Sequence, residues 1–306
     1  MTKFKINRQS FRRNINYENK FYNKKNDELN LYLNVIRKTV ISNSFLLQYF
    51  LKIVVVYMIS NGVTTWVAVS IPVVLEFSRT LSRGFSKITS TEENIKKEYE
   101  KIEKEVNFNF LAIKKPIQTH TNIVKVLTKE NLNDDFQDVD GLITDLKGVA
   151  LVTSLADCQG ILLYDPIKKI IGNIHSGWKG TLNKIIVNAI KLMEENFGCD
   201  PKNIEAYICP SILKCCFEVD KEVVDMFYEN YNNIDDYVMK GDIKQGKQKY
   251  YIDTISINVN SMKELGLLEG NIHCSNICTK CHSDKYHSYR TDHDKSGRNI
   301  ALICLK

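Results

Sequence analysis

Short apolar runs that alternate with helical patterns most constrain the fold of this chain. After residue 106, apolar runs of strand length recur between polar and glycine-containing segments. Such runs are typical of strands buried on both faces. The predicted strands cover residues 150–153, 161–164, 169–174, 206–209 and 300–305. Segments with helical periodicity separate several of them, so the sequence predicts an α/β or α+β fold with mixed sheets.

The helical patterns differ in strength. Apolar residues at helical spacing predict a helix over residues 182–197 that ends at Gly198. Similar patterns predict helices over residues 221–229 and 255–265, and a charged segment with an acidic first turn predicts another over residues 92–106. The sequence contains no internal repeat and no glycine-rich phosphate loop. Function must therefore be sought in individual side chains.

The N-terminal region, residues 1–75, differs in composition from the rest of the chain. Residues 1–44 are polar and basic, and much of the net charge of +6 lies within residues 1–25. Such a run is typical of a disordered, solvated extension, and we expect no nucleic-acid partner. Residues 45–75 begin with an apolar stretch that is short for a membrane span of about 20 residues. Two interpretations stay open for them: a targeting or membrane-anchoring segment, and the start of the buried core.

The cysteine content bears on the cellular compartment. The chain has nine cysteines, an odd number, and Cys215 and Cys216 are adjacent. This pattern is not typical of a secreted disulfide framework. We expect an intracellular protein with reduced thiols, located in the cytoplasm. The alternative is an organelle-targeted or membrane-anchored protein, with membrane contact through residues 45–75.

Three metal-capable side chains lie at the edges of apolar strands: His120, Cys158 and His175. A catalytic zinc site takes three protein ligands from His, Cys or carboxylate and leaves a fourth position for water or substrate. These residues meet that count, although their wide separation along the chain matches no compact zinc motif. The same residues also permit a thiolate nucleophile at Cys158 with a histidine base.

Four ordered motifs resemble the signatures of the YfiH or laccase-domain family. They are residues 118–120 (QTH), 152–165 (VTSLADCQGILLYD), 175–180 (HSGWKG) and 288–298 (SYRTDHDKSGR). The resemblance covers a catalytic domain over residues 77–306. It implies a compact α/β domain of mixed sheets in α/β/β/α layers. It also implies one zinc ion held by His120, Cys158 and His175.

The family has been described as multicopper polyphenol oxidases and later as purine nucleoside phosphorylases. The resemblance implies cleavage of adenosine, inosine and methylthioadenosine with phosphate as co-substrate, and deamination of adenosine. Some positions depart from the family pattern: Ser176 and Lys179 replace alanine and arginine. A glycine-rich stretch near the family's start is degraded to residues 78–86 (SRTLSRGFS), where either Arg79 or Arg83 takes the place of the family arginine.

Each activity requires groups beyond the metal ligands. For deamination, zinc lowers the pKa of a bound water to about 7, and Asp157 or Asp140 is the candidate proton carrier. The H-x-E and P-C-x-x-C signatures of other nucleoside deaminases do not occur in the sequence. For phosphorolysis, cations must hold the phosphate. Arg290 is the first candidate because a guanidinium matches phosphate oxygens, and Arg298 and Lys179 are alternatives.

Two aromatic residues are candidates for stacking on the purine base. Tyr289 and Trp178 lie inside the family motifs, and aromatic faces pack well on flat bases. The structural alternative for Trp178 is a place in the core.

The segment 274–282 (CSNICTKCH) also invites a zinc interpretation. A C-x-x-C pair followed by histidine is typical of closed structural sites. The family, however, has a Cys-Thr pair before its Ser-Tyr-Arg motif, and Cys278 and Thr279 take that place here. We therefore interpret the further thiols of this segment as incidental.

Three other functions compete with the zinc enzyme. A cysteine hydrolase or amidase would use Cys158 as nucleophile, and bound zinc would argue against it because a ligating thiolate is not free to attack. A multicopper oxidase needs about ten histidine ligands, whereas the chain has six histidines. A membrane-tethered binding protein would rest only on the apolar stretch within residues 45–75.

Overall fold

The computed structural model describes residues 56–57, 65–70, 73–78 and 92–306. The chain divides into two units, and the second, residues 54–306, contains all the described residues. The basic extension over residues 1–44 and the choice between Arg79 and Arg83 lie outside the described residues.

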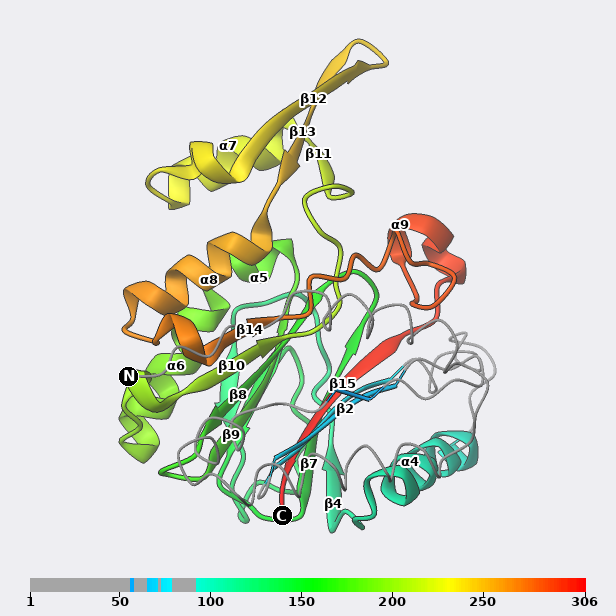
Figure 1. Cartoon of the computed structure of the whole chain (residues 1–306), viewed down its shortest axis with the longest axis vertical. Helices are drawn as coiled ribbons and strands as arrows, with labels where there is room; N and C mark the ends of the chain where they lie inside the picture. The colour runs from blue at the N-terminus through cyan, green and yellow to red at the C-terminus, as the bar shows by residue number, and fades with distance from the viewer. Residues whose placement is uncertain (1–55, 58–64, 71–72, 79–91) are drawn as a thin grey trace, which may run out of the picture. The chain divides into compact units, whose positions relative to one another are not determined.

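Two six-stranded sheets form the centre of the second unit (Figure 1). The first has the order β1-β2-β3-β15-β7-β4 and the second the order β14-β10-β8-β9-β6-β5. The first sheet consists of β1 (Val56–Tyr57), β2 (Thr65–Ser70), β3 (Val73–Ser78), β4 (Ala112–Lys114), β7 (Val149–Leu155) and β15 (Asn299–Leu305). The second consists of β5 (Val124–Val126), β6 (Gly141–Thr144), β8 (Gln159–Asp165), β9 (Ile170–Ser176), β10 (Glu205–Ile208) and β14 (Ile272–Cys274). All five strands predicted from the sequence are confirmed, with small shifts at their ends.

The central strands are buried on both faces, because alternate side chains enter different layers of the core. In β15, Ala301 and Ile303 pack between the two sheets, whereas Leu302 packs on the opposite face of the first sheet. In β8, Leu162 faces the layer between the sheets and Leu163 faces the outer layer of the second sheet. This double burial explains why the strands appear in the sequence as continuous apolar runs.

Helices cover the outer faces of both sheets. Helix α4 (Glu92–Val106) packs Ile102 and Val106 against β7 and β15. Helices α6 (Ile185–Phe197) and α8 (Thr254–Glu264) pack on the second sheet. Figure 1 shows α4 on the opposite side of the sheets from α6 and α8. The predicted α/β/β/α layering is therefore confirmed.

One predicted helix begins later than its apolar pattern suggested. Leu182 ends the short helix α5 (Trp178–Leu182), and α6 starts only at Ile185. Lys184, between them, has a left-handed backbone with φ of 59°. Apolar spacing continues across both helices and conceals this break. Gly198 caps α6 in the left-handed conformation, as predicted.

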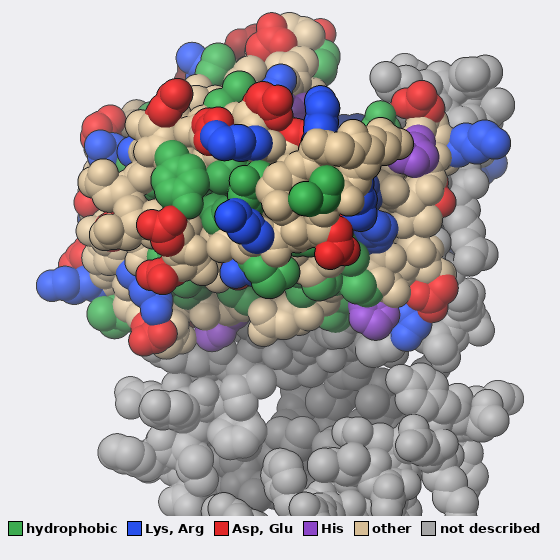
Figure 2. All heavy atoms as spheres, turned by 90° about the horizontal axis from the view of Figure 1, so that it is seen from above, with side chains coloured by type: hydrophobic (Ala, Val, Ile, Leu, Met, Phe, Trp, Pro, Cys, Tyr) green, Lys and Arg blue, Asp and Glu red, His purple; other side chains and the backbone are tan. Residues whose placement is uncertain are grey.

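A small third sheet was not predicted from the sequence. It has the order β11-β13-β12. It is built from β11 (Glu218–Asp220), β12 (Val238–Lys244) and β13 (Lys247–Ile252), with α7 (Lys221–Asn230) beside it. Strand β12 is mostly exposed, β13 is mostly half-buried, and lysines occur in both, so an apolar pattern was lacking. Figure 2, which views this end of the molecule, shows basic and acidic side chains interspersed with hydrophobic ones.

The remaining helices are short. They are α9 (Tyr289–Asp292) and the 3-10 helices η3 (Pro201–Asn203), η4 (Ile234–Tyr237), η5 (Glu269–Asn271) and η6 (His293–Lys295). In the described part of the chain, no helix is long and apolar enough to cross a membrane. Strands β2 and β3 pair with each other and β3 pairs with β15. The division of the N-terminal region at residues 44 and 76, and both interpretations of residues 45–75, stay predictions.

Candidate metal centre

The antiparallel pair β8 and β9 brings Cys158 and His175 together. Gly160 in β8 lies opposite His175 in β9, and Cys158 directly precedes β8. The separation of the two residues along the chain is thus the length of a strand pair and its turn. His120, Cys158 and His175 form one group whose ligand atoms all lie within 4.8 Å of one another. The structure therefore assembles the three residues predicted as metal ligands.

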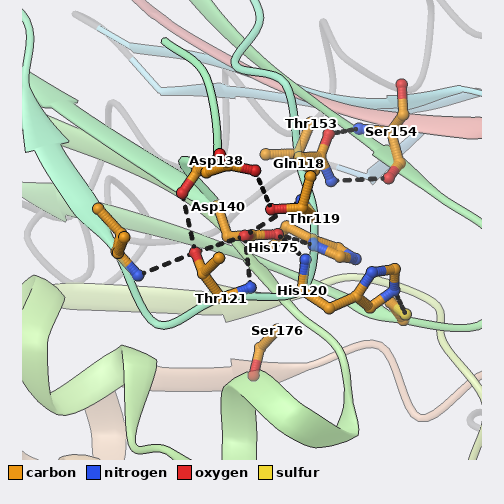
Figure 3. Close-up of polar contacts among 12 residues, drawn as sticks. Gln118, Thr119, His120, Thr121, Asp138, Asp140, Thr153, Ser154, His175 and Ser176 are labelled. Carbon is orange, nitrogen blue, oxygen red and sulfur yellow. Dashed lines mark hydrogen bonds and ion pairs between the residues drawn. The ribbon is translucent and has the colours of Figure 1, made fainter.

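Parallel pairing of β5 with β6 brings His120 to the same place. Val124 in β5 lies opposite Gly141 in β6, so the loop before β5 meets Asp140, the residue before β6. The Asp140 carboxylate accepts backbone hydrogen bonds from His120 at 3.1 Å and Thr121 at 2.7 Å (Figure 3). His120 has a positive φ of 65°, which is unfavourable for a residue with a side chain. The hydrogen bonds to Asp140 offset that cost and hold the loop.

The same carboxylate orients His175. Its Oδ1 atom lies 2.7 Å from His175 Nδ1, and both side chains are buried. Because Nδ1 is hydrogen-bonded to Asp140, Nε2 is the nitrogen that His175 can offer to a metal. Histidine ligands of metals commonly have such a hydrogen bond from their other ring nitrogen to a carboxylate. Burial by itself would raise the pKa of Asp140, but hydrogen bonds from His175 and Thr121 outweigh it and lower that pKa to about 2.

Cys158 and His175 influence each other's protonation, and His120 lies beside the thiol. The Sγ atom of Cys158 lies 3.7 Å from His120 Nε2. Burial by itself would raise the pKa of Cys158, but the charge of His175 and hydrogen bonds from both histidines lower it to about 6. Burial would lower the pKa of His175, whereas the charge of Cys158 and the hydrogen bond to Asp140 raise it to about 9. The group thus favours a thiolate, the form in which cysteine binds metals.

The donor set fits a tetrahedral metal site. With Zn–S of about 2.3 Å and Zn–N of about 2.0 Å, sulfur and nitrogen ligands of a tetrahedron lie about 3.5 Å apart, close to the 3.7 Å between Cys158 and His120. Gly177 leaves the space that the ligands occupy. A Cβ atom at Gly177 would lie 2.8 Å from His120 Cδ2 and 3.2 Å from Cys158 Sγ. Two histidines and a cysteine also occur as ligands of mononuclear copper, so the donors alone do not select the metal.

Asp157, the predicted proton carrier, joins the centre to the segment that carries Arg290. Its Oδ1 accepts a hydrogen bond from the Thr279 hydroxyl at 2.7 Å, and its Oδ2 accepts one from the Arg290 backbone at 2.7 Å. The Arg290 guanidinium donates through Nη1 to the carbonyl of Glu218 at 2.8 Å. Its centre lies 5.7 Å from the ring of Phe217. Asp157 therefore positions the start of α9 beside Cys158.

The other predicted substrate-binding residues lie on or near two short helices. Trp178 and Lys179 begin α5, directly after Gly177, and the Lys179 ammonium lies 5.7 Å from the Trp178 ring. Tyr289 begins α9, and its side chain is 48% exposed and therefore accessible to a ligand. Arg298 donates hydrogen bonds to the carbonyls of its neighbours at 296 and 297. Its guanidinium therefore bonds within its own segment rather than to the three candidate ligands.

Sequence reasoning missed a buried polar network beneath the centre. The Asn258 amide in α8 donates to Gln159 at the start of β8, to Ser176 at the end of β9 and to Thr181 in α5. Gln159 in turn donates to Thr254. These bonds fix the strand ends that carry Cys158 and His175 relative to α5. Polar residues within otherwise apolar segments were the only signal in the sequence.

We expect an Asp140→Asn substitution to weaken zinc binding by about 10- to 100-fold, the usual cost of losing an outer partner of a histidine ligand. The amide keeps the size of the carboxylate but removes its charge and one acceptor. Competition with a chromophoric chelator measures the affinity. Asp138→Asn is the matched control, because Asp138 is exposed on the same loop and accepts from Thr119. Equal zinc affinity in both variants would contradict the role of Asp140.

Together, the fold and the site define an α/β domain with four layers and a candidate metal centre of two histidines and one cysteine. Residues 79–306 match the family described as multi-copper polyphenol oxidoreductase laccase. The chain belongs to this family.

Similar proteins carry names of nucleoside enzymes. A protein of Borreliella burgdorferi named purine nucleoside phosphorylase is 37% identical over 64% of this chain and 82% of its own length. The purine nucleoside phosphorylase YlmD of Bacillus subtilis is 31% identical over 62% of this chain and 69% of its own length. A prokaryotic protein named adenosine deaminase RL5 is 32% identical over 62% of this chain and 74% of its own length.

Solved structures share the fold. The crystal structure of the YfiH protein of Bacillus licheniformis has a TM-score of 0.69 and 25% identity, and it covers 76% of this chain and 93% of its own. YlmD from Geobacillus stearothermophilus has a TM-score of 0.67 at 23% identity, over 80% of this chain and 93% of its own. The family description names copper, whereas the names of the relatives indicate nucleoside chemistry.

Proposed function

We propose that this chain is a zinc-dependent purine nucleoside phosphorylase that also deaminates adenosine. Adenosine, inosine and methylthioadenosine are the proposed nucleosides, with inorganic phosphate as co-substrate. The observation that most supports the proposal is the group of His120, Cys158 and His175, oriented by the buried Asp140. The names of the relatives support the class of substrate. The unpaired cysteines favour an intracellular, cytoplasmic location.

One zinc ion is the cofactor of the proposal, held by the imidazoles of His120 and His175 and the thiolate of Cys158. When bound, zinc supplies a Lewis acid that lowers the pKa of a coordinated water to about 7. Asp140 keeps His175 in the tautomer that can bind, because it accepts the Nδ1 proton. The pair of bonds from the His120 loop to Asp140 holds the second imidazole ready for binding.

The proton carrier that we propose is Asp157. It is next to Cys158 in the chain and 8% exposed, whereas Asp140 is 0% exposed and its carboxylate accepts hydrogen bonds from the His120 loop. The two hydrogen bonds that Asp157 accepts, from Thr279 and Arg290, fix the direction of its carboxylate. Proton transfer to or from a purine nitrogen requires such fixed geometry.

Phosphate binding falls to basic residues near the start of α5 and α9. Arg290 is the first candidate, since its backbone N–H bonds to Asp157, the neighbour of Cys158, and its guanidinium donates to the Glu218 carbonyl. Lys179 is exposed beside Trp178 and can supply a second cation. Arg298 is the third candidate. Trp178 and Tyr289 offer aromatic faces for the purine base.

The test uses purified protein, metal analysis by mass spectrometry, and adenosine, inosine and methylthioadenosine, each with and without phosphate. We expect about one zinc ion in the centre, formation of adenine and ribose 1-phosphate only when phosphate is present, and formation of inosine without it. A chelator should abolish both reactions and added zinc should restore them. Protein that carries zinc but leaves all three nucleosides unchanged would overturn the proposed function. Copper in place of zinc, with an absorption band from the thiolate, would overturn the cofactor.

A cysteine hydrolase is the second candidate. Burial by itself would raise the pKa of Cys158, but the neighbouring histidines lower it to about 6. A lowered thiol pKa is typical of cysteine nucleophiles. The two functions respond to metal in opposite ways. A hydrolase would gain activity when the metal is removed, since the thiolate would then be free to attack. The phosphorylase would lose activity.

A further inference from the structure

A second group of four cysteines lies outside the candidate metal centre. The Sγ atoms of Cys215, Cys216, Cys278 and Cys281 all lie within 4.8 Å of one another. Cys281 Sγ is 3.4 Å from Cys216 Sγ and 3.7 Å from Cys215 Sγ. We propose that these four thiolates bind a second metal ion, a structural zinc ion in a closed tetrahedral site. This inference does not depend on the proposed nucleoside activity.

The fold brings two distant cysteine pairs together. Strands β10 and β14 are parallel neighbours, and their chains continue side by side beyond the strand ends (Figure 1). Ser211 pairs with Cys278 in an isolated bridge, with the Thr279 N–H donating to the Ser211 carbonyl at 3.0 Å. Each of the two segments then forms a turn, one at residues 214–216 and the other at residues 279–285. The two turns present their thiols to each other.

The sulfur–sulfur distances fit a zinc site better than a disulfide. Four sulfurs at about 2.3 Å from zinc lie about 3.8 Å apart in a tetrahedron. The separations of 3.4 and 3.7 Å in the structure are close to this value and far from the S–S bond of about 2.05 Å in a disulfide. Four thiolates leave no open position, which is typical of structural rather than catalytic zinc sites.

Exposure separates these cysteines from those that serve as core residues. Cys199, Cys209 and Cys304 are buried among apolar side chains, the usual environment of a free cysteine. In the cluster, Cys278 is buried and the half-buried Cys216 packs against the same apolar side chains, whereas Cys215 and Cys281 are exposed. Hydrophobic packing therefore does not account for the gathering of all four thiols.

The proposal differs from the interpretation of the segment 274–282 that the sequence favours. That interpretation treats the further thiols as incidental, and its zinc alternative groups Cys274 and His282 with Cys278 and Cys281. The partners of the C-x-x-C pair are instead Cys215 and Cys216, which lie in a distant, earlier part of the chain. Cys274 belongs to β14, and neither it nor His282 is in the group.

A metal at this site would hold Asp157 and Arg290 in place beside the first centre. Thr279, next to Cys278, donates the hydrogen bond to Asp157, and Arg290 donates to the carbonyl of Glu218, which closely follows Cys216. The cluster joins the two turns from which these bonds come. Loss of the second metal should therefore loosen Asp157 and Arg290 while leaving the ligands of the first centre in place.

Metal analysis of the full chain tests the proposal. Freshly purified wild-type protein should contain about two zinc ions per chain, one for each site. The Cys216→Ser/Cys281→Ser double variant should lose one and keep the other, and His120→Ala should likewise keep one. Cys274→Ser is the matched control and should keep both, because Cys274 lies outside both groups. Equal metal content in the double variant and the wild type would overturn the site.

Cobalt substitution provides a readout that does not require the double variant to fold. In the His120→Ala protein, cobalt should show the intense visible bands of a site with four thiolate ligands. A spectrum typical of fewer sulfur ligands would contradict the proposal. Iron with a charge-transfer spectrum would overturn the choice of zinc. A disulfide among the four cysteines in freshly isolated, alkylated protein would overturn metal binding altogether.

Discussion

Replacing Cys158 by alanine should empty the candidate metal centre and lower kcat/KM for phosphorolysis of adenosine by at least about 10³-fold, or about 4 kcal/mol of transition-state stabilisation. Catalytic zinc sites use three protein ligands, and the variant would retain only His120 and His175. Metal content by mass spectrometry and steady-state kinetics with and without phosphate measure the effect. Deamination of adenosine should fall together with phosphorolysis.

The control for this experiment is Cys274→Ala, which removes a half-buried thiol outside both cysteine-containing groups. It should keep its metal and its activity. The metal content of the Cys158→Ala variant distinguishes the two candidate functions. An inactive variant with the same zinc content as the wild type would show that Cys158 acts as a nucleophile and not as a ligand.

The second large effect is expected from Gly177→Ala. The backbone at Gly177 has φ of −71° and ψ of 176°, which alanine adopts without strain. The added methyl group, however, would lie 2.8 Å from His120 Cδ2 and 3.2 Å from Cys158 Sγ. One or both side chains must move, and a displacement of about 1 Å can cost about 10²-fold in rate. We expect a loss of this size in kcat/KM, with zinc affinity reduced by a similar factor.

Gly270→Ala is the matched control, because no atom lies within 4 Å of its added Cβ. Its activity and zinc affinity should equal those of the wild type. Thermal unfolding of both variants shows whether Gly177→Ala acts on the site or on the fold, since overpacking costs about 1–3 kcal/mol of stability. A Gly177→Ala protein with unchanged zinc affinity would mean that His120 and Cys158 do not share a metal.

The sequence predicted the strands of the two central sheets but not those of the small third sheet. Strands such as β8 and β15 were predictable because burial on both faces requires continuous apolar sequence. Strand β12 is largely exposed, β13 is largely half-buried, and both contain lysines, so their pairing with each other defines them more than an apolar pattern does. The break at Lys184 between α5 and α6 was hidden, since apolar spacing records burial but not a single residue with positive φ.

The sequence by itself determined the chemical types of the candidate ligands, the strand edges that carry them and the layered fold, because these depend on local composition and on motifs. Only the tertiary structure decided which residues meet. The pairing of β8 with β9 and of β5 with β6 gathers the three candidate ligands around Asp140. The parallel pairing of β10 with β14 likewise brings Cys216 close to Cys281. Strand register is a long-range property of the backbone, and no spacing within a single segment records it.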